Sequence, residues 1–338
     1  MRNFNFSMSL LHLDVISIKI LLGKHRTRIL YYLPWVLDRA KNEIREMTYV
    51  EYNKLKTEVV GLIEYMFQQM KTKDYKSYAL FLASAYKDEL YSRIPPYVPF
   101  ATEFVYEQYI DETRNSFLSE YLMGYEERLR HPDKINCNSV SYDINLQMMI
   151  YTHIWESKLF LKRLIRIANI MSYNGYIWDI PFVRKNKKDR EVEVKKGQLI
   201  KDTILPLFKN SDSRLYEFLS SCYNSDLRNS FAHSMYTIDE NCKKINTIER
   251  TFDGFESSID FAEWETLFIK IALFNFHLPQ VLENCREELM IEISNSELHY
   301  IPYMLSYKDK DGKLILLELK LGLSNQRGYS EFQFYKDK

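Results

Sequence analysis

Glycine and proline, the residues that most often interrupt helices, are scarce in this sequence, with 9 of each among 338 residues. A composition so poor in both excludes a collagen-like or Pro/Gly-rich disordered chain. The sequence also has no excess of charge of either sign: 46 Lys and Arg balance 46 Asp and Glu, so the formal net charge is zero. The sequence is therefore not that of a globally basic nucleic-acid binder, although it leaves a local basic patch open.

Several sequence signatures of cofactor and metal sites are missing. The four cysteines are widely spaced and form no CxxC pair, which excludes a zinc ribbon and is typical of buried thiols in a reducing compartment. The chain contains no GxxxxGK[ST], GxGxxG, GxSxG or HExxH pattern. We therefore predict no metal and no cofactor.

Long uncharged apolar runs are also lacking. No stretch approaches the roughly 20 apolar residues of a membrane span. The apolar start of the chain is interrupted by His12, Asp14 and Lys19, and no small-residue cleavage site follows. We therefore expect a protein that is soluble and cytoplasmic, with no membrane partner.

What the sequence does contain is long helical periodicity in a composition that is 46% hydrophobic, which is typical of a packed protein. We predict helices over residues 26–48, 50–71, 75–93, 98–130, 143–171, 198–223 and 258–290, and a short helix beginning at Ser225 or Asp226. Small hairpins are predicted over 176–195, 234–250 and in the tail. The fold class is mainly α, a helical bundle with small β-hairpin embellishments and a helical N-terminal region.

Three regions follow from a break rich in Pro, Asn, Ser and Asp over residues 131–143. Residues 1–135 are a helical N-terminal region with a regulatory or partner-binding role. Residues 136–290 form a second helical domain, and residues 291–338 form a C-terminal β-hairpin extension.

The tetrapeptide RNSF occurs twice, as RNSFLS from Arg114 and as RNSFAH from Arg228. Only the second copy is followed by a histidine, His233, and the equivalent residue of the first copy is Ser119. Because serine is a poor base or acid near pH 7, we interpret the first copy as a coincidence on an ordinary helix.

Arg228, Asn229 and His233 together offer the groups for metal-free cleavage of an RNA phosphodiester. Asn229 and His233 are four residues apart and share one face of a helix. Histidine moves protons near neutral pH, arginine binds phosphate through two oxygens, and asparagine can orient either partner. Since one histidine does not easily serve as both base and acid, we expect two copies to meet in a homodimer.

RNSFAH resembles the Arg-x(4–6)-His motif of the HEPN superfamily, in which a polar residue, often Asn, follows the arginine. The resemblance implies a compact helical bundle, an HEPN-like domain over residues 136–290, and a metal-independent endoribonuclease. It implies that Arg228, Asn229 and His233 are catalytic, in a composite site made by two copies. Members of the family act in toxin–antitoxin systems, abortive infection and antiviral defence, which implies RNA, such as tRNA or mRNA, as substrate and an antitoxin or sensor as partner.

Two alternatives remain open. The first is a non-catalytic HEPN-type module for RNA binding or dimerisation. It predicts a buried or capped His233, whereas an enzyme predicts a His233 in an open groove at the two-fold interface. The second is a metal-dependent nuclease that uses Glu318 and Lys320 with Asp309 and Asp311 upstream.

A basic stripe is a further candidate for RNA binding. Lys158, Lys162 and Arg166 recur every four residues on the helix predicted over 143–171. The plainer interpretation is a solvated helix face. His153, on the same helix, is interpreted as a satisfied core residue.

Overall fold

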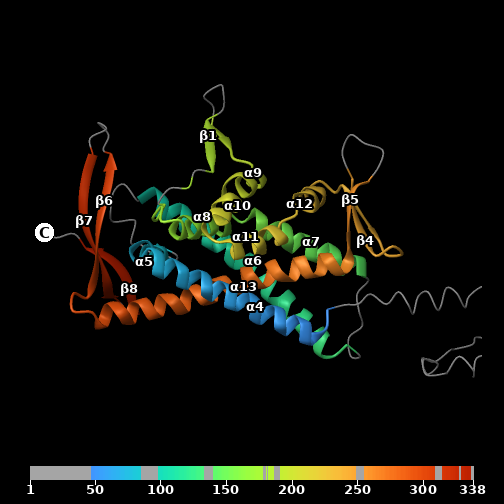
Figure 1. The fold of residues 1–338 in the computed structure, drawn as a ribbon, viewed down its shortest axis with the longest axis horizontal. Helices are drawn as coiled ribbons and strands as arrows, with labels where there is room; N and C mark the ends of the chain where they lie inside the picture. Colours follow the sequence, from blue (N-terminus) through green and yellow to red (C-terminus); the bar gives the residue numbers. More distant parts are fainter. Residues whose placement is uncertain are drawn as a thin grey trace, which may run out of the picture. The chain divides into compact units, whose positions relative to one another are not determined.

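Helices make up most of the chain that the computed structural model describes, so the predicted mainly α fold class is confirmed. The described residues are 47–84, 98–132, 140–177, 180, 182–185, 191–248, 255–308, 314–326 and 329–335. Their helices are α4 (Tyr49–Lys73), α5 (Tyr75–Ser84), α6 (Val98–Arg130), α7 (Val140–Glu156), α8 (Lys158–Met171), α9 (Lys196–Leu199), the π-helical turn η2 (Ile200–Ile204), α10 (Leu205–Ser211), α11 (Ser213–Cys222), α12 (Ser225–Ala232) and α13 (Phe261–Asn295) (Figure 1). The helix predicted over 26–48 lies almost wholly outside the described residues.

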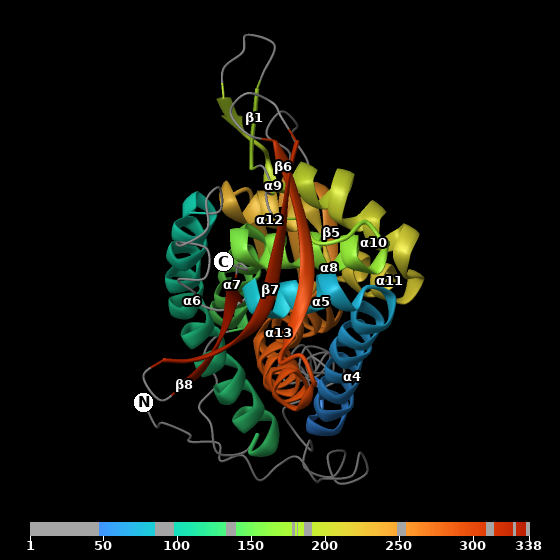
Figure 2. The same ribbon diagram turned by 90° about the vertical axis from the view of Figure 1, so that its left-hand side faces the viewer.

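Helices α4 and α13 lie side by side and run in the same direction (Figures 1 and 2). The backbone N–H of Met47, just before α4, donates to Glu265 near the start of α13 at 2.9 Å. Near the end of both helices, Lys71 forms an ion pair with Glu292. Pro279 lies inside α13 and, with no N–H of its own, removes one helical hydrogen bond.

The prediction of one long helix over 143–171 is wrong in one respect. The structure divides this segment into α7 and α8 at Ser157. The backbone of Ser157 is extended, with φ −68° and ψ 115°. Its hydroxyl accepts a hydrogen bond from the N–H of Phe160 at 3.1 Å, so Ser157 is the N-cap of α8. The sequence signal was present, since serine is a preferred N-cap residue.

A buried polar chain joins three helices in the core. The indole N–H of Trp264 on α13 donates to the amide oxygen of Gln147 on α7 at 2.7 Å. The amide nitrogen of Gln147 donates in turn to the hydroxyl of Tyr121 on α6 at 2.9 Å. Both ends of the Gln147 amide are therefore hydrogen-bonded in the core, and the two bonds tie α6, α7 and α13 together.

Three small antiparallel sheets occur within the described residues. They are β1 (Val183–Lys185) with β2 (Glu191–Glu193); β3 (Tyr236–Asp239), β4 (Lys244–Ile248) and β5 (Phe255–Asp260); and β6 (Tyr300–Lys308), β7 (Leu314–Gln326) and β8 (Tyr329–Tyr335). The predicted hairpins are confirmed. The second and third sheets each carry one further strand, β5 and β8, that the sequence analysis did not predict.

Residues 46–338 form one compact unit. Helices α4 and α5 pack with α8 and α13 in a shared core, so helices before and after residue 135 contact one another. The functional boundaries at 135 and 290 stay predictions. Among the helices of the described residues, none is long and apolar enough to cross a membrane.

Candidate functional site

The start of α12 is fixed by its N-cap and by a tyrosine from α7. Asn224, and not Ser225 or Asp226 as predicted, is the N-cap residue, and its side-chain oxygen accepts from the N–H groups of Asp226 and Leu227, each at 3.0 Å. The buried Tyr151 hydroxyl accepts from the N–H of Asn224 at 2.8 Å. These bonds anchor the short helix that carries RNSFAH to the body of the protein.

The end of α12 places His233 on the surface. His233 is the C-cap residue and is exposed. The next residue, Ser234, has φ +55°, and its N–H bonds to the carbonyl of Phe231 at 3.0 Å, while the N–H of Met235 bonds to the carbonyl of Ser230 at 2.7 Å. This pair of bonds is the Schellman motif. It ends the helix at a defined residue and so fixes where the imidazole emerges.

Arg228 is held by an acid that is distant in the sequence. Its guanidinium forms an ion pair with Glu156, the last residue of α7. Glu156 also accepts from the Lys196 ammonium at 2.7 Å, so one carboxylate lies between two cations. The Arg228 guanidinium further donates to the amide oxygen of Asn229 at 2.9 Å. The group of Arg228, Lys196 and Glu156 therefore carries one net positive charge.

The Arg228 side chain is largely enclosed. Its Nε atom is buried and has no hydrogen-bond partner among the described residues, and the same holds for the Tyr223 hydroxyl. Burial lowers the pKa of the guanidinium below its ordinary value. A Cβ atom at Gly197 would lie 3.2 Å from the Tyr223 hydroxyl and 3.5 Å from the nearest Arg228 nitrogen, so the absence of a side chain lets α9 approach the arginine.

The structure thus brings Arg228 and Asn229 into contact and places His233 at the exposed end of the same helix. Asn229 is exposed too, so the amide and the imidazole are both open to solvent. Glu156, Lys196 and Gly197 of this site were not predicted from the sequence. No local spacing could have found Glu156, because it lies 72 residues before Arg228 in the chain.

The predicted basic stripe is not an open surface. Lys162 and Arg166 are buried on α8, with 6% and 7% of their surface exposed. The Lys162 ammonium lies 5.7 Å from the ring centre of Phe182, and the Arg166 guanidinium lies 5.2 Å from that of Tyr176. Two of the three stripe residues are therefore covered by aromatic side chains. Lys158, half-buried, lies 5.9 Å from the Phe182 ring centre.

The residues of the metal-nuclease alternative do not form a cluster where the structure describes them. Glu318 lies on β7 opposite Met304 and is exposed, and the Lys320 ammonium lies 4.7 Å from the ring centre of Tyr300. Asp309 and Asp311 lie outside the described residues. Within the described residues, no three His, Cys, Asp or Glu side chains come together in a way that could hold a metal ion.

The first RNSF copy lies on α6 and has Ser119 where the second copy has His233. A histidine from another helix, His153, nevertheless lies near its arginine, Arg114. Arg114 and Asn115 line a pocket that also contains His153 of α7. His153 is half-buried on this pocket. Helix α7 therefore places a side chain beside each arginine, Glu156 at Arg228 and His153 at Arg114.

Comparisons of this chain with protein-family models, with curated proteins and with solved structures gave no match.

Proposed function

We propose that the protein is a metal-independent endoribonuclease of HEPN type, with its active site at Arg228, Asn229 and His233. The observation that carries the proposal is the exposure of His233 beside Asn229, on the helix whose arginine brings a fixed positive charge. The enzyme calls for a His233 in an open groove at a two-fold interface, and the non-catalytic alternative for a buried or capped one; the exposure of His233 to solvent supports the first. The resemblance of residues 228–233 to the family motif supports the same assignment.

Each group has a defined task in this proposal. His233 takes the proton from a ribose 2′-hydroxyl, and the resulting oxygen attacks the neighbouring phosphorus. The Arg228 guanidinium stabilises the charge that grows on the phosphate oxygens, with the Lys196 ammonium as a second cation near it. The 5′-oxygen leaves with a proton from an acid. The products are a 2′,3′-cyclic phosphate and a 5′-hydroxyl.

The ion pair with Glu156 fits a positioning role. Glu156 accepts from Lys196 and pairs with Arg228, so it keeps two cations on one side of α12. Asn229, which accepts from Arg228, is placed to orient the guanidinium or the substrate. Since a single imidazole is present on this helix, we propose that the acid comes from His233 of a second copy in a homodimer.

The setting in the cell is part of the proposal. The RNA substrate, tRNA or mRNA, places the protein in the cytoplasm, and the family's roles in toxin–antitoxin systems and antiviral defence imply an antitoxin or sensor partner. Residues 1–135 are assigned to regulation or to that partner.

The test is cleavage of total cellular RNA, in excess EDTA, by the wild type, by His233→Ala and by His131→Ala. His131 is an exposed histidine that lies outside the motif, at the end of α6. We expect cleavage by the wild type and by His131→Ala and none by His233→Ala. Equal activity of both variants, or loss of wild-type activity on adding EDTA, would show that the chemistry lies elsewhere.

A further inference from the structure

Two aromatic rings lie close to the turn that presents His233. Phe231 is in the last turn of α12, and Tyr236 is the first residue of β3. Their ring centres are 5.5 Å apart and their planes are inclined at 38° to each other. Both residues are half-buried, so the pair is partly open to solvent. Phe231 and Tyr236 together form a small aromatic platform near the exposed imidazole.

The turn after α12 brings the two rings together. Ser234, at φ +55°, ends the helix and turns the chain, and the N–H of Ile248 on β4 then bonds to the carbonyl of Met235 at 2.9 Å. Tyr236 follows and pairs with Thr247 across the sheet. In a Schellman motif the apolar contact comes from the residue after the left-handed one, here Met235. The contact between the two rings is therefore additional to the helix cap.

Helix α7 holds the platform in place. The Tyr236 hydroxyl donates to the amide oxygen of Asn145, which is exposed on α7. Glu240, just after β3, accepts from the hydroxyl and from the N–H of Ser141 at the start of the same helix. Burial raises the pKa of Tyr236 above its ordinary value, so the phenol stays neutral beside a phosphate. A ring whose hydroxyl is already bonded loses little freedom when a ligand stacks on it.

A cation lies one helical turn from the platform. Arg228 and Phe231 are three residues apart on α12, so they share one side of the helix. The group of Arg228, Lys196 and Glu156 carries one net positive charge. A nucleotide joins a phosphate to a flat base through one sugar. The charged group and the platform, about 5 Å apart along the helix axis, offer the matching pair of surfaces.

We propose that the aromatic platform of Phe231 and Tyr236 stacks the base of the nucleotide whose 2′-hydroxyl His233 deprotonates. This inference rests on the endoribonuclease function proposed for α12, and it names the substrate as a single-stranded segment of RNA. A base that stacks on the platform must leave the stack of a duplex, so an RNA helix does not fit. Because every base has a flat face, the platform selects for an unpaired base and not for one kind of base.

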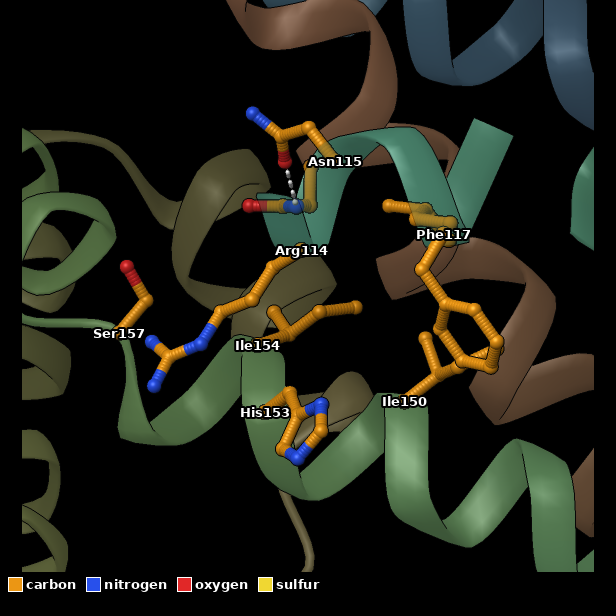
Figure 3. A pocket seen from close by; sticks show the side chains of 9 residues that line it. Arg114, Asn115, Phe117, Ile150, His153, Ile154 and Ser157 are labelled. Atoms are coloured by element: carbon orange, nitrogen blue, oxygen red, sulfur yellow. Dashed lines mark hydrogen bonds between the residues drawn. The ribbon is translucent and has the colours of Figure 1, made fainter. Parts of the chain in front are cut away.

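The first RNSF copy supplies a matched control. Its phenylalanine, Phe117, is 36% exposed and has the position in RNSF that Phe231 has in the second copy. Figure 3 shows Phe117 beside Ile150, on the side of its pocket away from the Arg114 guanidinium. Phe117→Leu therefore removes a surface ring of the same type from α6, and it should leave RNA binding unchanged.

The test is binding of a single-stranded hexanucleotide with 2′-fluoro sugars, which lack the attacking hydroxyl and so are not cleaved. A 2-aminopurine base occupies each position in turn, because its fluorescence falls when it stacks on an aromatic ring. We expect the wild type to quench one or two positions and to bind the hexanucleotide more tightly than its duplex. Phe231→Leu should abolish the quenching and weaken binding about 10-fold, as lost stacking predicts. Tyr236→Phe, which keeps the ring, should retain both.

The proposal is overturned if the wild type does not bind the hexanucleotide at up to about 1 mM, or binds it without quenching any position. It is also overturned if Phe231→Leu, with a melting temperature like that of the wild type, quenches and binds as the wild type does. Tyr236→Leu tests the same pair of rings if Phe231→Leu does not fold. Dissociation of the proposed homodimer by Phe231→Leu but not by Phe117→Leu, measured by sedimentation, would assign the rings to contact between copies and would overturn it too.

Cleavage of the same hexanucleotide with ribose sugars separates this inference from the proposed function. Quenching by the wild type without cleavage would refute the proposed function and leave the base-binding site. Cleavage without quenching would keep the function and refute the base-binding site.

Discussion

Replacing Glu156 by Gln removes the carboxylate that lies between Arg228 and Lys196 while keeping the size of the side chain. The side chains of Glu156 and Arg228 are 28% and 14% exposed. The pair is thus intermediate between an exposed pair, worth about 0–1 kcal/mol, and a buried pair, whose disruption costs about 3–5 kcal/mol. We expect Glu156→Gln to lower the free energy of unfolding by about 2 kcal/mol, because two cations lose their shared partner.

A double-mutant cycle measures this interaction directly. Urea unfolding of the wild type, Glu156→Gln, Arg228→Gln and the double variant should give a coupling energy of about 1–2 kcal/mol, with similar slopes against urea in all four. The control is the pair of Lys54 and Glu58, 3.9 Å apart on α4, with side chains 77% and 60% exposed. Its cycle should give a coupling close to zero.

A coupling between Glu156 and Arg228 no larger than the control would refute this reasoning. It would mean that Arg228 is not held by the carboxylate in solution. The positioning role proposed for Glu156 at the site on α12 would then have no physical basis.

Three further results are expected. Burial, and then Arg114, lower the pKa of His153, so the folded state binds a proton here less readily than the unfolded state. The contribution of this histidine to stability is therefore present above about pH 6.5 and is lost as the pH falls. An NMR titration should place its midpoint below 6.5 and Arg114→Ala should raise it; a midpoint unmoved by Arg114→Ala would contradict this. Ser234→Gly should raise the free energy of unfolding by up to about 1 kcal/mol in a thermal melt, since the backbone at φ +55° suits glycine, and any decrease would be evidence against it. Gln147→Leu should cost about 2–4 kcal/mol in urea unfolding, because the Trp264 indole N–H loses its acceptor and the Tyr121 phenol oxygen loses its donor, whereas the exposed Gln198→Leu should cost little.

Much of the helical architecture was predictable, because it follows from local periodicity and caps. The helices predicted over 50–71 and 98–130 match α4 and α6 closely. The break at Ser157 was missed because apolar residues continue at helical spacing on both sides of it. The strands β5 and β8 were missed because a third strand depends on pairing across the sheet and not on a turn signal.

The burial of Lys162 and Arg166 shows the limit of spacing arguments. A period of four places cations on one face of a helix but does not say whether that face meets solvent. On α8 nearly every residue is buried, and aromatic side chains from the following segment cover the two cations. The sequence of α8 is that of an amphipathic helix, with Lys158, Lys162, Arg166 and Asn169 on one face, so it predicted a solvated face where the structure has a covered one.

The candidate site was predictable only in part for a similar reason. Arg228, Asn229 and His233 are neighbours in sequence, and the exposed end of α12 follows from local capping. Glu156 reaches Arg228, and His153 reaches the Arg114 pocket, through the packing of separate helices. Contacts of that kind depend on tertiary structure, which no motif encodes.

The measurement that most directly tests the central proposal is cleavage of a short 5′-labelled RNA in excess EDTA, compared with the same RNA carrying 2′-deoxy nucleotides. The account predicts that the wild type cuts the RNA to products with 2′,3′-cyclic phosphate and 5′-hydroxyl ends, leaves the 2′-deoxy substrate intact, and loses activity in Arg228→Ala and His233→Ala. Cleavage of the 2′-deoxy substrate, products with 5′-phosphate ends, or no cleavage of RNA by the wild type would contradict it.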